Sequence, residues 1–194
     1  MNKFNKIINY EFSKKNTPYT KKFNYSENNK NSFRIWNPFK NTLSAAVACG
    51  LELIPINRNS SLLCIGDLEP NSYLNLLDLV ENKQKIFCLT KTSSSIFQQE
   101  NLSQFDNLDE IKTKFSVIYV NNYEYTYEFI QNITKLFLKS DGYLLIPLSK
   151  SSINFDDIFK KLSHDFQIIQ EVNIELYFKS TSLLICKYKK ILSQ

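Results

Sequence analysis

Short apolar runs alternate with amphipathic segments along most of the chain after residue 60. The runs are continuous and rich in aliphatic and aromatic residues, which favours strands buried on both faces. Predicted strands span residues 61–65, 85–89, 95–99, 115–120, 141–148, 166–177 and 182–190, and predicted helices span residues 39–50, 72–82, 125–139 and 155–165. Strands that alternate with helices indicate a mainly parallel sheet covered on both sides. The two strands that end the chain predict an antiparallel hairpin at one edge of this sheet.

This α/β layout is similar to the class I S-adenosylmethionine-dependent methyltransferase fold, a Rossmann-like sheet. The first 35 residues follow another pattern, since they are polar and aromatic and carry the turn signals NTP and SENNKN. We predict two or three short strands there. The expected organisation is therefore a small, basic, β-rich N-terminal region (1–35) followed by a methyltransferase-like α/β domain (36–194).

Charge is distributed unevenly along the chain. Residues 1–40 hold nine lysines and arginines against two glutamates, a net charge of +7, whereas residues 41–134 hold six against eleven acidic residues, a net charge of −5. Basic residues interleaved with aromatic ones are typical of contacts with single-stranded RNA. The alternative is a small sheet whose aromatic residues pack and whose lysines are only solvated. The candidate RNA contacts are the two lysine doublets, Lys14, Lys15, Lys21 and Lys22.

The cysteines suggest an intracellular, reducing compartment. Four are present, without CxxC spacing, and the chain has one histidine, so we expect buried thiols and no metal site. The apolar stretches are far shorter than a membrane span and the N-terminus lacks a signal-peptide core, so we expect no membrane association. The cysteines are Cys49, Cys64, Cys88 and Cys186.

Residues 62–80, LLCIGDLEPNSYLNLLDLV, form a predicted strand–turn–helix of the kind that holds nucleotide-like cofactors. Such turns are usually rich in glycine, because the backbone approaches the ligand closely. This turn keeps only Gly66 and then places Asp67, Glu69 and Pro70 where small residues are expected. A helix N-terminus attracts anions such as a carboxylate, but Glu69 opposes this and Pro70 lacks an N–H donor.

Residues 34–66, RIWNPFKNTLSAAVACGLELIPINRNSSLLCIG, resemble the most recognisable stretch of the fibrillarin family. That family comprises the 2′-O-methyltransferases of box C/D ribonucleoproteins, with a Trp-Asn-Pro-Phe start, an alanine-rich helix, an Ile-Pro-Ile segment and a strand that ends in glycine. The resemblance continues to Val80 and resumes from Phe115 to about Tyr188. It implies rRNA processing or modification, S-adenosylmethionine as cofactor, guide RNA or rRNA and a Nop-type scaffold protein as partners, and, in a eukaryotic cell, a nuclear or nucleolar location.

The cofactor positions implied by this resemblance are substituted. The family turn Gly-Ala-Ala-Ser-Gly-Thr-Thr corresponds to residues 66–72, GDLEPNS, and the acidic residue that receives the ribose hydroxyls corresponds to Thr90. Thr90 can form one hydrogen bond but lacks the charge of a carboxylate. By the same resemblance, Asn101 replaces an aspartate near the adenine. The remnant cofactor positions are Gly66, Asn71, Ser72, Thr90, Asn101, Asn121 and Asn122.

The catalytic positions implied by the resemblance are substituted as well. The family's Lys-Asp-Lys-His set falls on Thr42, Asn121, Ser149 and Thr181, so that no catalytic residue is expected. Lys150 lies one position beyond Ser149, and such an offset on a strand directs a side chain to the opposite face. A partial rescue by Lys150 stays open if it lies beyond the strand. We expect His164 to be a surface or packing residue.

Three functions are compatible with these observations. The first is a fibrillarin-like structural scaffold in an RNA–protein particle, with no bound cofactor expected. The second is an active or weakly active 2′-O-methyltransferase that uses S-adenosylmethionine, and the third is a stand-alone RNA-binding module. A structural member needs a docking surface, for which the segment RIWNPFK is the candidate. Arg34 and Lys40 are predicted to contact RNA or a partner, and Trp36 is either an exposed anchor or a core residue that packs the N-terminal region onto the main domain.

Overall fold

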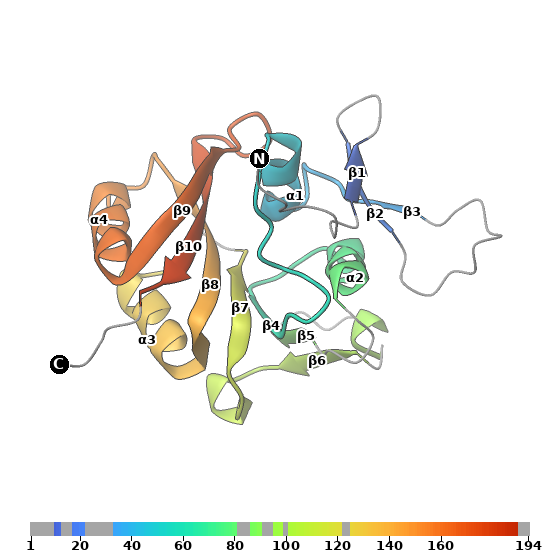
Figure 1. Cartoon of the computed structure of the whole chain (residues 1–194), viewed down its shortest axis with the longest axis horizontal. Helices are drawn as coiled ribbons and strands as arrows, with labels where there is room; N and C mark the ends of the chain where they lie inside the picture. The colour runs from blue at the N-terminus through green and yellow to red at the C-terminus, as the bar shows by residue number, and fades with distance from the viewer. Residues whose placement is uncertain are drawn as a thin grey trace, which may run out of the picture.

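A computed structural model describes residues 10–12, 17–21, 33–80, 86–90, 95–98, 101–121 and 125–189. Two sheets and four α-helices form this part of the molecule (Figure 1). The strands are β1 (Tyr10–Phe12), β2 (Pro18–Lys21), β3 (Phe33–Ile35), β4 (Leu62–Ile65), β5 (Ile86–Leu89), β6 (Leu102–Phe105), β7 (Phe115–Val120), β8 (Leu138–Ser149), β9 (Phe166–Asn173) and β10 (Thr181–Tyr188). The helices are α1 (Thr42–Ala48), α2 (Pro70–Leu79), α3 (Tyr127–Phe137) and α4 (Phe155–Asp165), with the 3₁₀ segments η1 (Ser95–Gln98) and η2 (Leu108–Glu110).

The large sheet has the strand order β6-β5-β4-β7-β8-β10-β9. Strands β4 to β8 pair in parallel, and β10 lies antiparallel between β8 and β9. The predicted α/β fold, with a mainly parallel sheet and an antiparallel hairpin at its edge, is therefore confirmed. Continuous apolar strands end up in the centre because both faces of the sheet are covered.

One predicted strand is wrong. Residues 95–98 form η1 rather than a strand, and the third parallel strand is the later segment β6. Phe97 packs edge-on against Tyr73 of α2, with ring centroids 5.2 Å apart, so this segment lies against the helix layer instead of pairing in the sheet.

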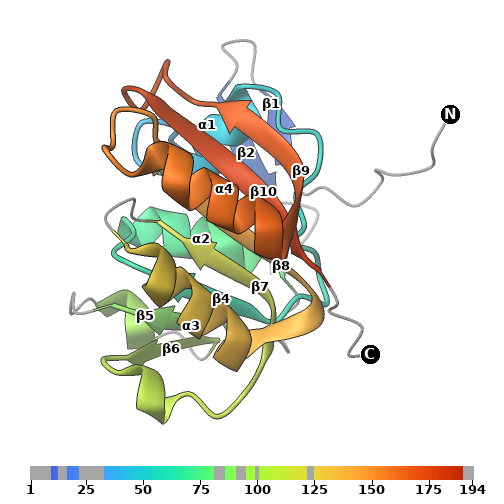
Figure 2. The ribbon, with the colours of Figure 1, turned by 90° about the vertical axis from the view of Figure 1, so that its left-hand side faces the viewer.

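Helices cover both faces of the large sheet, with α3 and α4 on one side and α1 and α2 on the other (Figures 1 and 2). Two apolar layers result, because neighbouring residues of each strand point to opposite faces. Leu183 and Ile185 join the layer under α1, whereas Leu184 and Cys186 join the layer under α4. In the described part of the chain, no helix is long and apolar enough to cross a membrane.

The first helix after the WNPF segment has well-defined ends. The Asn41 side chain accepts a hydrogen bond of 2.9 Å from the Ser44 N–H and caps α1. The helix closes at Gly50, whose φ of +92° lies in the left-handed region that favours glycine. The predicted stop at Gly50 is confirmed.

The small sheet has the order β1-β2-β3, as the sequence predicts for this region, and it docks on α2. The carboxylate of Asp78 on α2 accepts hydrogen bonds from Thr20 Oγ1 at 2.7 Å and from Arg34 Nε at 3.0 Å. Asn75 Nδ2 donates to Thr20 Oγ1 at 2.8 Å. Because Thr20, Asn75 and Asp78 are buried, these bonds form a polar junction inside the molecule. Arg34 therefore belongs to a partly exposed ion pair through its Nε, and its role as a contact for RNA or a partner stays a prediction.

Candidate cofactor cleft and catalytic edge

A cavity of about 300 Å³ lies where the parallel strands end. Gly66 follows β4, Thr90 follows β5, Asp106 follows β6 and Asn121 follows β7. In parallel sheets these carboxyl ends meet at one edge, where ligands usually bind. The cavity is lined by Gly66, Asp67, Leu89, Thr90, Asp106, Tyr125 and Phe129.

The turn after β4 uses its own backbone donors. The Gly66 N–H donates to the Leu89 carbonyl at 3.0 Å, and the Leu68 N–H donates to the Tyr73 hydroxyl at 3.3 Å. Gly66 has a φ of +95°, which explains why this position is a glycine. Pro70 is the first residue of α2 and has no N–H, and Glu69 at the N-cap forms no capping bond with its side chain. The turn therefore offers an anion fewer N–H groups than a glycine-rich turn would.

Asp67 and Thr90 hydrogen-bond directly, with the Thr90 hydroxyl as the donor. Thr90 is buried, and its carbonyl accepts a further bond of 3.1 Å from Gln104 Nε2 on β6. The family resemblance implies a carboxylate at the end of β5. This chain has the Thr90 hydroxyl there instead, and it binds the carboxylate of Asp67 in the neighbouring turn. The remaining turn positions are polar, with Asn71 exposed and Ser72 buried in the first turn of α2.

Asn121 is held by three hydrogen bonds. Its Oδ1 accepts from the Tyr119 hydroxyl at 2.8 Å and from Thr42 Oγ1 at 3.3 Å, and its Nδ2 donates to the Asp67 carbonyl at 2.9 Å. The Thr42 and Tyr119 hydroxyls also lie 2.9 Å apart, and because each carries one proton, the Thr42 proton is donated either to Tyr119 or to Asn121. Burial raises the pKa of the Tyr119 phenol above its usual range, so this hydroxyl keeps its proton. The Asn121 amide oxygen accepts from Tyr119 and competes with Tyr119 for the Thr42 proton, which fits a structural clamp and not a proton acceptor.

The other two family positions face each other across β8 and β10. Ser149 and Thr181 are register partners, and they lie at the same edge of the sheet as Asn121. The Ser149 hydroxyl is 2.8 Å from that of Ser151, and Thr181 Oγ1 donates to the Lys179 carbonyl at 2.9 Å. The structure therefore brings all four positions to one edge but supplies none with an ionisable side chain.

Lys150 does not replace the missing lysine. Its Nζ lies 3.1 Å from Glu171 Oε1 on β9, and Glu171 is in register with Leu184, which packs in the layer under α4. Burial opposes ionisation of Glu171, but hydrogen bonds from Ser182 and Lys150 hold the pKa of this carboxyl below its ordinary value. Lys150 lies just beyond β8, which ends at Ser149, but its ion pair with Glu171 holds its ammonium group on the α4 side of the sheet.

The assignment of Asn101 to the cofactor site is wrong. Asn101 precedes β6, and its carbonyl accepts from the Ile86 N–H at the amino ends of the strands. The cavity lies at the opposite ends, where Asp106 follows β6 and lines it. Sequence reasoning missed Asp106 because it placed the third strand too early. The signal was the alternating segment LSQF followed directly by an acidic residue.

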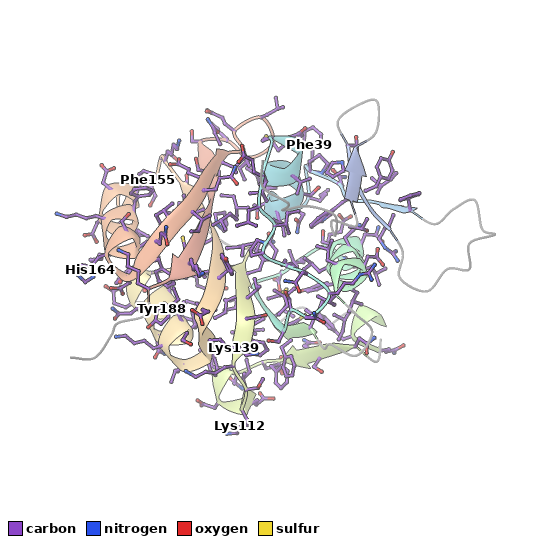
Figure 3. The ribbon with its side chains drawn as sticks, viewed as in Figure 1. Phe39, Lys112, Lys139, Phe155, His164 and Tyr188 are labelled. Atoms are coloured by element: carbon purple, nitrogen blue, oxygen red, sulfur yellow. The ribbon has the colours of Figure 1, made fainter. Side chains whose placement is uncertain are left out.

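The residues predicted to contact RNA or a partner differ in their exposure. The Trp36 side chain has 0% exposure and is a core residue, which removes it as an exposed anchor, whereas Lys40 is exposed. The four candidate lysines fall outside the described side chains, as does Asn122. His164 is exposed on α4, as expected (Figure 3).

This architecture is that of class I S-adenosylmethionine-dependent methyltransferases. The chain belongs to the fibrillarin family, whose model matches residues 1–107. The fibrillarin-like rRNA/tRNA 2′-O-methyltransferase of Pyrococcus furiosus is 25% identical over 178 residues, which cover 80% of this chain and 78% of the relative.

Two solved structures share the fold. Aeropyrum pernix fibrillarin, in complex with natively bound S-adenosyl-L-methionine, has a TM-score of 0.72 at 14% identity and covers 88% of each chain. The fibrillarin of a fibrillarin/Nop5p complex has a TM-score of 0.71 at 19% identity and covers 93% of this chain and 97% of its own.

The residues of this cleft do not fit S-adenosylmethionine in the manner that the family resemblance implies. The ribose position, Thr90, already donates to Asp67, and the backbone of the turn is partly occupied by Leu89 and Tyr73. The cavity of about 300 Å³ is at the lower limit of typical ligand sites. Asp67 and Asp106 are the acidic side chains that line this cavity.

Proposed function

We propose that this chain is a structural, non-catalytic fibrillarin-type component of an RNA–protein particle of the box C/D kind. The observation that carries the proposal is the closed hydrogen-bond network of Thr42, Tyr119 and Asn121. A general base must have a free acceptor of suitable pKa within reach of the ribose hydroxyl. An amide has no such pKa, and here its oxygen already accepts a hydrogen bond from Tyr119. Loss of one general acid–base group typically costs about 10²–10⁴ in rate.

Two kinds of partner follow from the family. RNA is proposed as one, supported by the net charge of +7 over residues 1–40. A Nop-type scaffold protein is proposed as the other, since a related fibrillarin forms a complex with Nop5p. In this proposal the chain has a structural role in the particle, and another subunit carries out any methyl transfer.

A second candidate function is a weakly active 2′-O-methyltransferase. Asp106 favours it, because a carboxylate at this place in the cavity offers an acceptor for an amino group of a ligand. The two candidates differ in whether the free protein binds S-adenosylmethionine.

Isothermal titration calorimetry tests the proposal. We expect no saturable binding of S-adenosylmethionine below about 1 mM, which corresponds to about −4 kcal/mol. The fibrillarin of Aeropyrum pernix, freed of its native ligand, is the positive control. A dissociation constant near 10 μM, about −7 kcal/mol, would overturn the proposal in favour of the second candidate.

A further inference from the structure

An apolar groove lies at the junction of the small sheet with the large domain. Three segments far apart in the sequence form it: Thr17 before β2, residues 35–39 and the turn between β9 and β10. Its volume is about 480 Å³. Phe39 lies on its wall, beside α1 (Figure 3), with its ring centroid 4.9 Å from that of Tyr177 and the two rings edge to face. The Phe39 groove is lined by Thr17, Ile35, Asn37, Pro38, Phe39, Leu176 and Tyr177.

The apolar side chains of the Phe39 groove are unusually exposed. Phe39 is 65% exposed, Ile35 59% and Leu176 77%. Phe33 is also exposed and shares a face of β3 with Ile35, since residues two apart on a strand point the same way. Contiguous exposed apolar surface of this kind marks interaction sites in soluble proteins.

The walls of the groove are held by internal hydrogen bonds. The Phe39 N–H donates to Asn37 Oδ1 at 3.0 Å, and the N–H groups of Tyr177 and Phe178 both donate to the Ile174 carbonyl at 2.9 Å. Trp36, buried directly before this turn, fixes it to the core. A preformed surface loses little conformational entropy on binding, which favours affinity.

The rim of the groove is basic. Lys40 and Lys179 are exposed beside Phe39 and Tyr177, against the single exposed carboxylate of Glu175 in the same turn. Such a rim attracts a negatively charged partner and raises its rate of association.

We propose that the Phe39 groove docks an acidic amphipathic helix of a partner protein, with its apolar face on Ile35, Phe39 and Leu176 and its carboxylates near Lys40 and Lys179. A helix laid into an apolar groove is a common recognition mode. RNA is the less suitable occupant, because Ile35 and Leu176 are aliphatic and the rings of Phe39 and Tyr177 pack on each other edge to face, which leaves no row of free aromatic faces on which successive bases stack. The inference does not depend on whether the chain transfers methyl groups.

Fluorescence anisotropy with two synthetic helical peptides tests the groove. Both carry Leu and Phe at positions i, i+3, i+4 and i+7, and one has Glu and the other Lys on its polar face. We expect the Glu peptide to bind the full-length protein at least about tenfold more tightly than the Lys peptide. The double variant Phe39→Ser/Leu176→Ser should weaken the Glu peptide at least about tenfold. The control Leu136→Ser/Ile153→Ser, at exposed apolar positions of α3 and of the segment before α4, should leave binding unchanged.

Three results would overturn the proposal. The first is that the Glu peptide does not bind, and the second is that the control variant loses as much affinity for it as the groove variant does. The third is that an RNA oligonucleotide, whose own binding needs Phe39 and Leu176, displaces the Glu peptide from the groove. Sedimentation of the protein alone reveals a fourth, a concentration-dependent dimer that Phe39→Ser/Leu176→Ser abolishes, which would make a second copy the occupant. Circular dichroism melts of both variants confirm that the fold is retained.

Discussion

The side-chain amide of Asn121 donates a hydrogen bond of 2.9 Å to the backbone carbonyl of Asp67. This bond links the end of β7 to the turn after β4, the two places that form the cleft. An aspartate at position 121 has no N–H to donate, and its charge would face the Asp67 carbonyl. The asparagine is therefore suited to the present cleft and is not simply a weakened aspartate.

Asn121→Asp should lower the free energy of unfolding by about 1–3 kcal/mol, because the change removes a donor and places a carboxylate against a carbonyl. The midpoint of urea denaturation measures this, at an unchanged slope. Asn132→Asp, which adds the same charge at an exposed position of α3, is the control and should have little effect. The double variant Asn121→Asp/Ser149→Lys should give no methylation of guided RNA above background. Restored methylation, or an Asn121→Asp variant as stable as the wild type, would contradict this interpretation.

Trp36→Ala should lower the free energy of unfolding by about 3–5 kcal/mol, because the indole is fully buried and its loss leaves a cavity. The neighbouring Phe39→Ala is the matched comparison and should cost about 0.5 kcal/mol or less, as expected for an exposed position. Chemical denaturation of both variants gives the two values. Equal losses would mean that Trp36 is not a core residue.

Arg34→Gln should weaken the attachment of the small sheet to α2. The change leaves the Asp78 carboxylate buried with Thr20 as a remaining donor. We expect a loss of about 1–3 kcal/mol, below the 3–5 kcal/mol of a fully buried pair, because Arg34 is partly exposed. Thermal unfolding and limited proteolysis of the first 35 residues report the effect. Arg58→Gln removes an exposed positive charge and serves as the control. If the two variants behave alike, the ion pair has no structural role.

Replacement of four N-terminal lysines by glutamine should weaken RNA binding and flatten its dependence on salt, with little change in melting temperature. Loss of four phosphate contacts reduces the slope of log K against log salt by up to about 3 for a single strand. A gel-shift series at rising salt measures the slope. The lysines are Lys14, Lys15, Lys21 and Lys22. The matched control replaces Lys112, Lys114, Lys135 and Lys139, four exposed lysines of the large domain. The same affinity and slope in wild type and N-terminal variant would exclude this segment as the RNA contact.

Apolar periodicity was sufficient for the central strands and for α4. The segment FSVIYV became β7 with the predicted bounds, and FDDIFKKLSHD became α4. The prediction failed between β5 and β7, because β6 has only four residues and lies in a polar stretch where periodicity did not locate it. Because of that error, Asn101 was predicted to lie at the cofactor site, although it precedes β6, and Asp106, which follows β6, was not recognised.

Less of the candidate site than of the fold could be predicted from the sequence. Thr42, Asn121, Ser149 and Thr181 were recognised as substituted, and the structure places them at one edge. The role of Tyr119 was not predictable, since its hydroxyl reaches Thr42 across 77 positions of the chain. Hydrogen bonds of this kind depend on tertiary packing, for which a strand pattern carries no signal.

The buried carboxylate of Asp78 joins helix α2 of the large domain to the N-terminal region of the chain. When the small sheet covers Asp78 of α2, hydrogen bonds from Thr20 and Arg34 replace the water that its carboxylate loses. We therefore expect that the border between residues 35 and 36 separates two sheets but not two units that fold alone. A shortened chain that starts at Trp36 would expose an unpaired acid and the apolar surface beneath the small sheet. Removal of the N-terminal region to study RNA binding would thus leave the large domain with a surface that is covered in the intact protein.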